Sequence, residues 1–205
     1  MKKKFDESFI NKDIKIIVGC DEVGRGCIAG PVVATCIILK DNFNSDLIDD
    51  SKKINKKKHF DLVNLIKENS IEYHTVFISE KIIDEINILN ATKLAMEKSL
   101  SKFQTKYDLI LTDYIKLNVN KKQENITKGD QKSLTIASAS LISKYTRDEY
   151  MKKLHKKYPE YGFNTNAGYL TKKHKNAILN NGILECHRHS FEPIKSLKTN
   201  NQLLK

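Results

Sequence analysis

The stretch IKIIVGCDEVGRGCIAGPVVATCIIL (14–39) decides the fold, because two apolar runs in it flank a segment rich in glycine. Residues 14–20 form a short apolar run that suits a buried strand. Residues 31–39 are rich in β-branched side chains, which favour a second strand. The glycine-rich segment 24–30 joins them and gives the backbone the freedom that a connection needs. The stretch therefore predicts two strands at the start of a sheet.

The rest of the chain alternates helical and strand patterns. Further strands are expected at 71–78 and 107–113, with one short strand at the end of the lysine-rich segment 114–128. Helices are expected at 53–69, at 82–100 with a break near Asn87–Asn90, at 133–158 and near 171–180. Strands with helices between them predict an α/β fold, with a helical region at the C-terminal end.

Length and composition exclude several classes of protein. The chain has 205 residues, 40% hydrophobic and 30% charged, which is typical of a globular protein with a sizeable core. It contains no stretch of about 18 apolar residues, so we expect no transmembrane helix. No apolar segment follows the basic N-terminus, so a secretory signal is not expected. Four cysteines without paired spacing indicate reduced, mostly buried thiols in a cytoplasmic protein.

The positive charge is concentrated in one part of the chain. Lysine and arginine total 36 against 25 acids, a net charge of +11. Residues 1–113 hold 18 of each sign, whereas residues 114–205 hold 18 cations and 7 acids. Such a surplus favours a polyanionic partner, either nucleic acid or an anionic membrane surface. The simpler alternative is a lysine-rich composition that only keeps the protein soluble.

Four acids differ from the solvated background. Asp21 and Glu22 directly follow the first strand, Asp113 follows the strand LILT, and Asp130 precedes the helix 133–158. Adjacent strand residues face opposite sides of a sheet, so Asp21 and Glu22 can share one site only where the strand bends or ends. We expect the glycines at 24 and 26 to supply that break.

Clustered carboxylates repel one another unless a cation lies between them. Hard oxygen ligands select Mg²⁺ or Mn²⁺ rather than zinc, and a two-metal site stabilises the attacking and leaving oxygens of a phosphoryl transfer. An acidic cluster within a basic protein is the combination that a metal-dependent nuclease needs. Only three of the 36 cations are arginines (Arg25, Arg147 and Arg188), so each is expected where a planar, bidentate donor is required. For Arg188, chance placement is an equal alternative.

Seven segments carry a resemblance to a known family. They are GCDEVGRGCIAGPVVA (19–34), DDSKKI (49–54), INILNATKLAM (86–96), LILTD (109–113), KGDQKSLTIASASLISKYTRDEYM (128–151), YPEYGFNTNAGY (158–169) and HRHSFEPIK (187–195). In order and spacing the chain resembles ribonuclease HII, the type 2 RNase H. The resemblance implies an RNase H-like mixed central sheet flanked by helices in residues 1–158, with a helical extension in 159–205 packed on the same domain.

The resemblance also implies an activity and its residues. The family cleaves RNA within RNA–DNA hybrids and single ribonucleotides embedded in duplex DNA, leaving 5′-phosphate and 3′-hydroxyl ends. Its metal-binding catalytic carboxylates match Asp21, Glu22, Asp113 and Asp130, with Mg²⁺ or Mn²⁺ expected in a two-metal site.

Substrate contacts follow from the same resemblance. The family's GRG motif, whose backbone contacts the ribose 2′-OH, matches Gly24, Arg25 and Gly26. The tyrosine that stacks on the adjoining deoxyribose matches Tyr169, for which packing of a helix on the sheet is the simpler reading. Positions associated with the phosphate backbone match Lys52 or Lys53, Ser140, Lys144 and Arg147.

The chain departs from the family pattern at a few positions. Cys27 stands where proline is common, Tyr114 where glycine is common, and His189 where a second arginine is common. Asn166–Ala167 replaces a basic pair, so we expect weaker substrate affinity beside Tyr169.

Three alternatives remain at this point. Ribonuclease HIII shares the core but carries an N-terminal substrate-binding domain, for which the position of Asp21 leaves no room. A non-catalytic nucleic-acid-binding protein on this fold should lack the carboxylates. A phosphohydrolase acting through an aspartyl phosphate would not explain the basic C-terminal part. We expect a monomer without a membrane partner, and His187 and His189 to hold the C-terminal segment.

Overall fold

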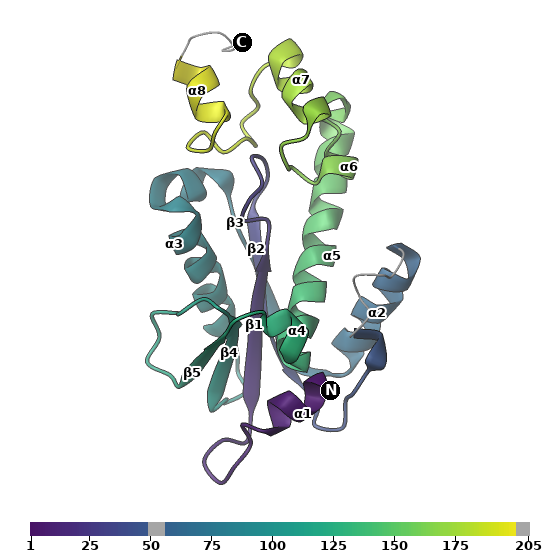
Figure 1. The fold of residues 1–205 in the computed structure, drawn as a ribbon, viewed down its shortest axis with the longest axis vertical. Helices are drawn as coiled ribbons and strands as arrows, with labels where there is room; N and C mark the ends of the chain where they lie inside the picture. Colours follow the sequence, from purple (N-terminus) through teal and green to yellow (C-terminus); the bar gives the residue numbers. More distant parts are fainter. Residues whose placement is uncertain (49–55, 200–205) are drawn as a thin grey trace.

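A mixed five-stranded sheet forms the centre of the computed structural model, which describes residues 1–48 and 56–199 (Figure 1). The strand order is β3-β2-β1-β4-β5. The strands are β1 (Ile17–Val23), β2 (Val32–Leu39), β3 (Ser70–Ile78), β4 (Leu109–Asp113) and β5 (Gln123–Ile126). β1 and β2 are antiparallel, as are β2 and β3, whereas β1, β4 and β5 are parallel. The expected mixed α/β fold is confirmed.

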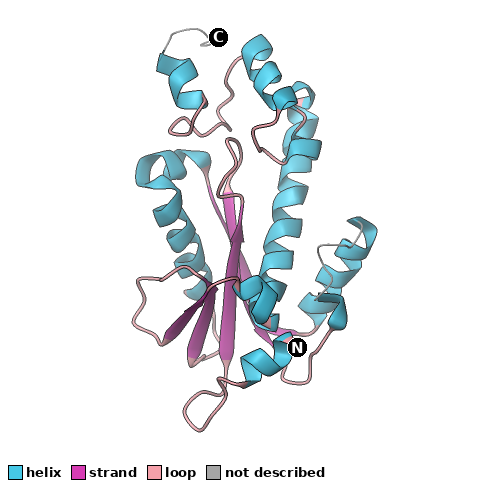
Figure 2. Cartoon of the chain, in the orientation of Figure 1, coloured by secondary structure: helices cyan, strands magenta, loops and turns pink. Residues whose placement is uncertain are grey.

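Two long helices cover the two faces of this sheet (Figure 2). They are α3 (Glu80–Leu100) on one face and α5 (Leu134–Lys157) on the other. The shorter helical elements are α1 (Lys2–Glu7), η1 (Asp46–Ile48), α2 (Lys56–Glu68), α4 (Gly129–Lys132), η3 (Pro159–Tyr161), α6 (Phe163–Asn166), α7 (Lys172–Asn181) and α8 (Ile194–Thr199).

Alternation along the strands separates the two layers of the core. Val18, Cys20 and Ile110 pack with α3, whereas Ile17 and Leu111 pack with Ile136 of α5. This period of two is what a sheet covered on both faces requires.

Gly19 allows β1 and α5 to approach closely. A methyl group at this position would lie only 2.6 Å from the carbonyl carbon of Thr135. α5 can therefore lie directly across β1, and small residues on the helix (Ala137, Ser138, Ala139) are buried there.

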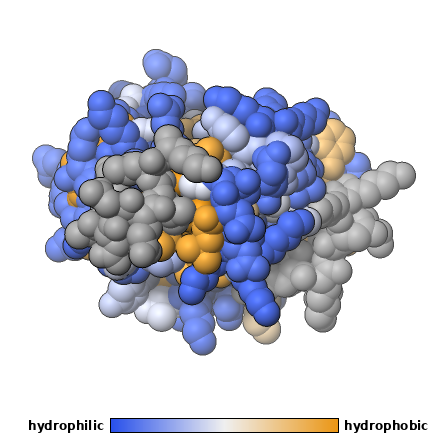
Figure 3. Space-filling model, turned by 90° about the horizontal axis from the view of Figure 1, so that it is seen from above, coloured by the Kyte–Doolittle hydropathy of each residue, from blue (hydrophilic) through white to orange (hydrophobic). Residues whose placement is uncertain are grey.

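The C-terminal elements pack on the connection between β1 and β2. Tyr161, Phe163 and Ile178 share one apolar cluster with Ile28 and Ala29 of that connection. The proposed division of the chain at residue 158 stays a prediction. Seen from this end, most of the coloured surface is hydrophilic, with a narrow hydrophobic strip near the centre and smaller hydrophobic areas at the margins (Figure 3).

Most expected elements agree with the structure. The break expected in the 82–100 helix occurs at Asn87, whose φ of 64° is not helical. The expected helix at 53–69 is described from Lys56 onward, and 53–55 lie outside the described residues. The four cysteines are free, with Cys186 the least buried. No helix in the described ranges is both long and apolar enough to span a membrane.

Candidate active site

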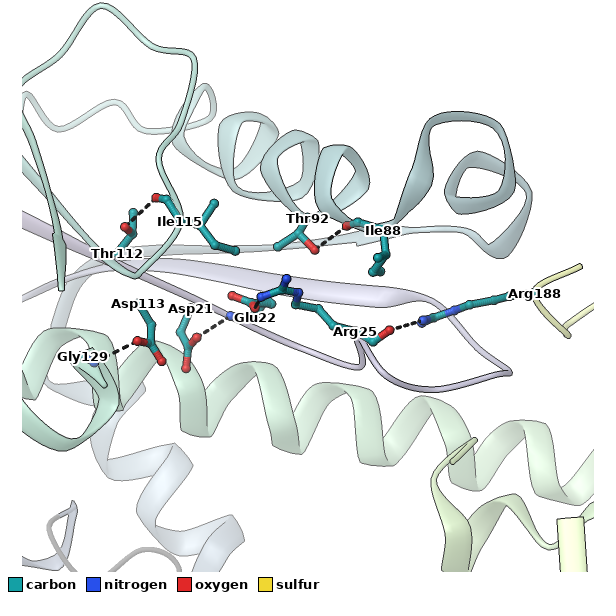
Figure 4. A network of polar contacts seen from close by, with 10 residues as sticks. All are labelled: Asp21, Glu22, Arg25, Ile88, Thr92, Thr112, Asp113, Ile115, Gly129 and Arg188. Atoms are coloured by element: carbon teal, nitrogen blue, oxygen red, sulfur yellow. Dashed lines mark hydrogen bonds and ion pairs between the residues drawn. The ribbon is translucent and has the colours of Figure 1, made fainter. Parts of the chain in front are cut away.

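Asp21 and Glu22 lie within β1 and not beyond its end. The strand continues to Val23, and Glu22 pairs with Ala34 of β2. The expected break at the glycines comes too late to bring the two side chains together. Asp21 therefore points to the α5 face of the sheet, while Glu22 lies on the α3 face with Arg25 (Figure 4).

Asp113 lies next to Asp21 because β1 and β4 are parallel and in register. Cys20 pairs with Thr112, so Asp21 and Asp113 are the next residue of each strand. Both carboxylates lie on the α5 side of the sheet (Figure 4). Asp113 Oδ1 accepts a hydrogen bond of 2.9 Å from the N–H of Gly129, and Asp130 is the next residue in the chain. The start of α4 thus lies against the end of β4.

Burial makes the carboxylates of Asp21 and Glu22 costly to ionise. It raises the pKa of Asp21 well above its usual range, and the Glu22 and Asp113 carboxylates raise it further. Burial also raises the pKa of Glu22, although Arg25 opposes the shift with a contact of 3.3 Å. The Oε2 atom of Glu22 is buried without a hydrogen-bond partner. An electron-rich site of this kind is stabilised by a bound cation.

α5 presents hydroxyl groups to the inner side of Asp21. Ser140 hydrogen bonds to the Asp21 carboxylate and lowers its pKa, against the larger effect of burial. Ser143 donates to the Asp21 carbonyl at 3.2 Å and to Thr35 Oγ1 at 2.8 Å. Lys144, one turn after Ser140, is exposed and pairs with Asp148 at 3.2 Å. Of these residues Lys144 is exposed, Ser140 is half-buried and Ser143 is buried.

Arg147 lies inside the glycine loop and not on the surface. Its side chain is 1% exposed and donates to the carbonyls of Pro31, Ala167 and Ala29, at 2.9, 2.7 and 3.1 Å. A side chain at Gly24, where φ is +93°, would collide with the Arg147 guanidinium. This arrangement gives Arg147 a structural role in holding the loop, and its contact with phosphate stays a prediction.

Arg188 holds the same loop from the other side. It is 0% exposed and donates to the carbonyls of Gly24, Arg25 and Gly30 over 2.6–3.0 Å. The bond to the Arg25 carbonyl is drawn in Figure 4. Chance placement of this arginine is therefore wrong. The scarcity of arginine in the sequence was the only signal, and it did not indicate a partner.

Tyr169 lies beside the glycine loop and is held by two histidines. A methyl group at Gly26 would be 3.8 Å from Cε1 of Tyr169, whose side chain is 47% exposed. The Tyr169 carbonyl accepts from His174 Nδ1 at 2.9 Å, and His174 Nε2 lies 3.1 Å from His187 Nε2. His187 Nδ1 accepts from the N–H of Leu184 at 2.8 Å, so its Nε2 carries the proton donated to His174.

Three non-glycine residues with left-handed backbone flank these candidate residues. They are Tyr114 (φ 66°) after Asp113, Lys128 (φ 57°) before Gly129, and Ala167 (φ 48°) before Tyr169. Such conformations are costly for residues with a Cβ and concentrate at functional sites. A fourth, Asn87, marks the break in α3.

Comparison with known proteins agrees with this geometry. The family model described as Ribonuclease HII matches residues 18–194. The chain belongs to the ribonuclease HII family. It is therefore an endoribonuclease, a hydrolase that acts on RNA–DNA hybrids.

Solved structures share the fold. The ribonuclease H2 of Pyrococcus horikoshii OT3 has a TM-score of 0.76 and 20% identity, over 91% of this chain and 98% of that one. RNase HII of Archaeoglobus fulgidus, in a complex with PCNA, has a TM-score of 0.69 and 20% identity, over 87% and 96%. Bst-RNase HIII in complex with Mn²⁺ has a TM-score of 0.66 and 16% identity, over 90% and 70%.

The predicted metal site of this family member is only partly assembled. Asp21 and Asp113 lie together, but Glu22 points to the other face because β1 stays extended. Within 1–48 and 56–199, no three or more histidine, cysteine, aspartate or glutamate side chains form a group that could hold a metal ion. The buried Glu22 Oε2 and the raised pKa values of Asp21 and Glu22 nevertheless fit a cation. Lys52 and Lys53, expected at the phosphate backbone, lie outside the described residues.

Proposed function

We propose that this chain is a divalent-metal-dependent endonuclease. It cleaves the RNA strand of hybrids and nicks duplex DNA on the 5′ side of a single ribonucleotide. The products carry 5′-phosphate and 3′-hydroxyl ends. The observation that carries the proposal is the adjacent pair of Asp21, which is buried, and Asp113, close to a glycine loop that two arginines hold in shape.

The acidic residues are proposed to hold Mg²⁺ or Mn²⁺. Asp21, Glu22, Asp113 and Asp130 offer carboxylate oxygens, the donor type that these ions prefer. Bound there, the metal would activate water and neutralise charge on the phosphate. Glu22 would join Asp21 and Asp113 only if the backbone at the end of β1 turns, because rotation of the side chain alone cannot carry it across the sheet. The Mn²⁺ in the Bst-RNase HIII structure supports the choice of metal.

The glycine loop is proposed to select the ribonucleotide. Arg188 hydrogen bonds to the carbonyls of Gly24 and Arg25. We therefore expect the loop to bind a 2′-hydroxyl through its backbone N–H groups. The 2′-hydroxyl is the group that distinguishes RNA from DNA. Tyr169, half-exposed beside Gly26, would pack against the next sugar. Lys144 and Ser140 are proposed to meet the phosphates, which position the duplex without reading its sequence.

A nicking assay tests each part of the proposal. Purified protein with Mg²⁺ or Mn²⁺ is given a DNA duplex that contains one ribonucleotide, and the same duplex without it. We expect a nick on the 5′ side of the ribonucleotide, none in the all-DNA duplex, and none after chelation of the metal. An Asp21→Asn variant that cuts as fast as the wild type would remove Asp21 from the mechanism. Cleavage of long hybrids alone would refute ribonucleotide excision but leave the hybrid nuclease.

A further inference from the structure

Tyr114 occupies a strained turn directly after Asp113. Its φ is 66°, and the N–H of Ile115 donates to the Asp113 carbonyl at 2.9 Å across it. A three-residue turn with positive φ is rare and strained, and a bulky side chain there is exceptional. The turn is also fixed from both sides, because the Tyr114 N–H contacts the carbonyls of Thr112 and Ile126 at 3.1 and 3.2 Å.

Packing within the protein does not compensate for this strain. The Tyr114 side chain is 73% exposed. Among the large apolar residues of the described ranges, only Met1 is more exposed than Tyr114. Backbone strain that no packing contact offsets is typical of functional sites. The ring is attached to the residue that follows a proposed metal ligand, so it is presented to solvent at the edge of the sheet where cleavage is proposed.

The charges near this turn suit a nucleic acid. Lys116 lies two residues after Tyr114, and Lys128 precedes the Gly129 that bonds to Asp113; both lysines are exposed. An aromatic ring flanked by cations is the arrangement that binds nucleic-acid strands, because every base has a face on which the ring can stack.

We propose that Tyr114 contacts the nucleic acid strand beside the cleaved bond, with its ring against a base or sugar. The inference rests on the proposed function, since it needs a duplex bound at Asp113. It makes Tyr114 a second aromatic contact, at the other end of the site from Tyr169.

A single fluorophore can test this contact directly. The chain has no tryptophan, so Tyr114→Trp introduces the only one. The variant is titrated with a dye-labelled duplex containing one ribonucleotide, in EDTA to prevent cleavage, and binding is followed separately by the anisotropy of the dye. Ile71→Trp is the control, because Ile71 is also exposed, at 49%, but lies near the start of β3, at the opposite end of the sheet.

The three outcomes separate this inference from the proposed function. Quenching of tryptophan emission at 114 but not at 71, with a rise in anisotropy, supports the contact. A rise in anisotropy without any change at 114 overturns the contact and leaves the nuclease proposal intact. Failure of the wild-type protein both to bind the duplex in EDTA and to nick it with Mg²⁺ or Mn²⁺ overturns both.

Tyr114→Gly gives a second, independent test. Glycine tolerates positive φ, so relief of strain should raise the Tm. Loss of the ring should weaken duplex binding by about tenfold, the scale of one base–aromatic stack. Tyr114→Phe should bind as the wild type does. A higher Tm with unchanged duplex affinity would show that the ring has no part in binding.

Discussion

Asp21 lies under α5 with its carboxylate bonded to the N–H of Glu22 at 2.8 Å and to Ser140. Because its folded pKa is raised, the folded protein holds the proton on this group more tightly than the unfolded chain does. The stability that Asp21 contributes is therefore complete below the ordinary aspartate pKa and is lost as the pH rises through the folded value. At neutral pH, ionised Asp21 costs stability unless a cation compensates.

This predicts that Asp21→Asn is more stable than the wild type at neutral pH without metal. A neutral amide removes the buried charge while keeping the shape, and 1 kcal/mol corresponds to about 2–4 °C in Tm for a chain of this size. Thermal unfolding in EDTA measures the difference. A variant with a lower Tm than the wild type across the neutral range would contradict the electrostatic interpretation.

Binding of a divalent ion should reverse the order of the Tm values, so that the wild type becomes more stable than Asp21→Asn. Mg²⁺ or Mn²⁺ should raise the Tm of the wild type, because a ligand that binds only the folded state stabilises it, and should raise that of Asp21→Asn much less. Protons and the metal ion compete for the same carboxylates. Cleavage should therefore fall as the pH is lowered toward the raised pKa values of Asp21 and Glu22. Equal metal-dependent Tm shifts in both proteins would place the ion elsewhere.

At the scale of elements, the loop between β1 and β2 owes its shape to α5 and the C-terminal segment. Arg147 comes from α5 and Arg188 from the chain after α7, and both donate to loop carbonyls. Burial lowers the pKa of Arg188 to about 10, so it stays charged at neutral pH. Charged donors make the stronger hydrogen bonds of a protein interior.

Arg188→Lys should therefore loosen the loop. One ammonium cannot reproduce three nitrogens that reach three carbonyls, so we expect a loss of about 2–4 kcal/mol in unfolding free energy by urea titration. Cleavage at a single ribonucleotide should fall further than cleavage of a long hybrid, because recognition of one 2′-hydroxyl depends on the loop. Arg25→Lys, at an exposed position of the same loop, is the control for exchanging arginine for lysine without removing the Arg188 contacts. An equal loss on both substrates would argue against a role in selection.

The His174–His187 pair makes the support of Tyr169 sensitive to pH. Burial lowers the pKa of His187 from 6.5 to about 3 and also lowers that of His174. Both must stay neutral in the fold, so their stabilisation is full above the ordinary histidine pKa and is lost as the pH falls from there toward 3.

We expect the unfolding free energy to fall between about pH 7 and about pH 5, by up to about 1.4 kcal/mol per pH unit for each proton taken up on unfolding. His187→Asn keeps an acceptor for the Leu184 N–H but cannot titrate, so it should flatten this dependence. His155→Gln, on α5 away from the pair, should not. Urea titrations at several pH values compare the three proteins.

Over the whole molecule, the basic surplus of residues 114–205 governs affinity for a duplex. Neutralised phosphates release counterions, so the affinity should fall steeply as salt is added. Lys144→Gln should reduce the slope of log affinity against log salt by about one. Lys40→Gln, beyond β2 at the opposite end of the sheet, should leave the slope unchanged. Anisotropy titrations of a labelled duplex at several salt concentrations measure both, and a slope that Lys144→Gln does not alter would remove Lys144 from the interface.

The sequence by itself determined the features that depend on local pattern. An apolar run and a run of β-branched residues predicted two strands and their connection, helical periodicity predicted the break at Asn87 and the limits of α5, and motif order indicated the family. Proximity of Asp21 and Asp113 was also foreseeable, since parallel strands end at one edge of a sheet. The expectation that Asp21 and Glu22 follow the end of the first strand was wrong, because β1 runs to Val23 before the glycines turn it.

The tertiary structure alone decided which distant groups meet. Arg188 reaches the Gly24 carbonyl across 164 residues of chain, and His174 joins His187 to Tyr169. No local period encodes such contacts, because they depend on how the C-terminal segment packs over Ile28 and Ala29. The exposure of single side chains was likewise decided by the tertiary structure. Arg147, expected at the phosphate backbone, is buried and donates to carbonyls inside the protein, whereas Tyr114 is exposed directly after Asp113.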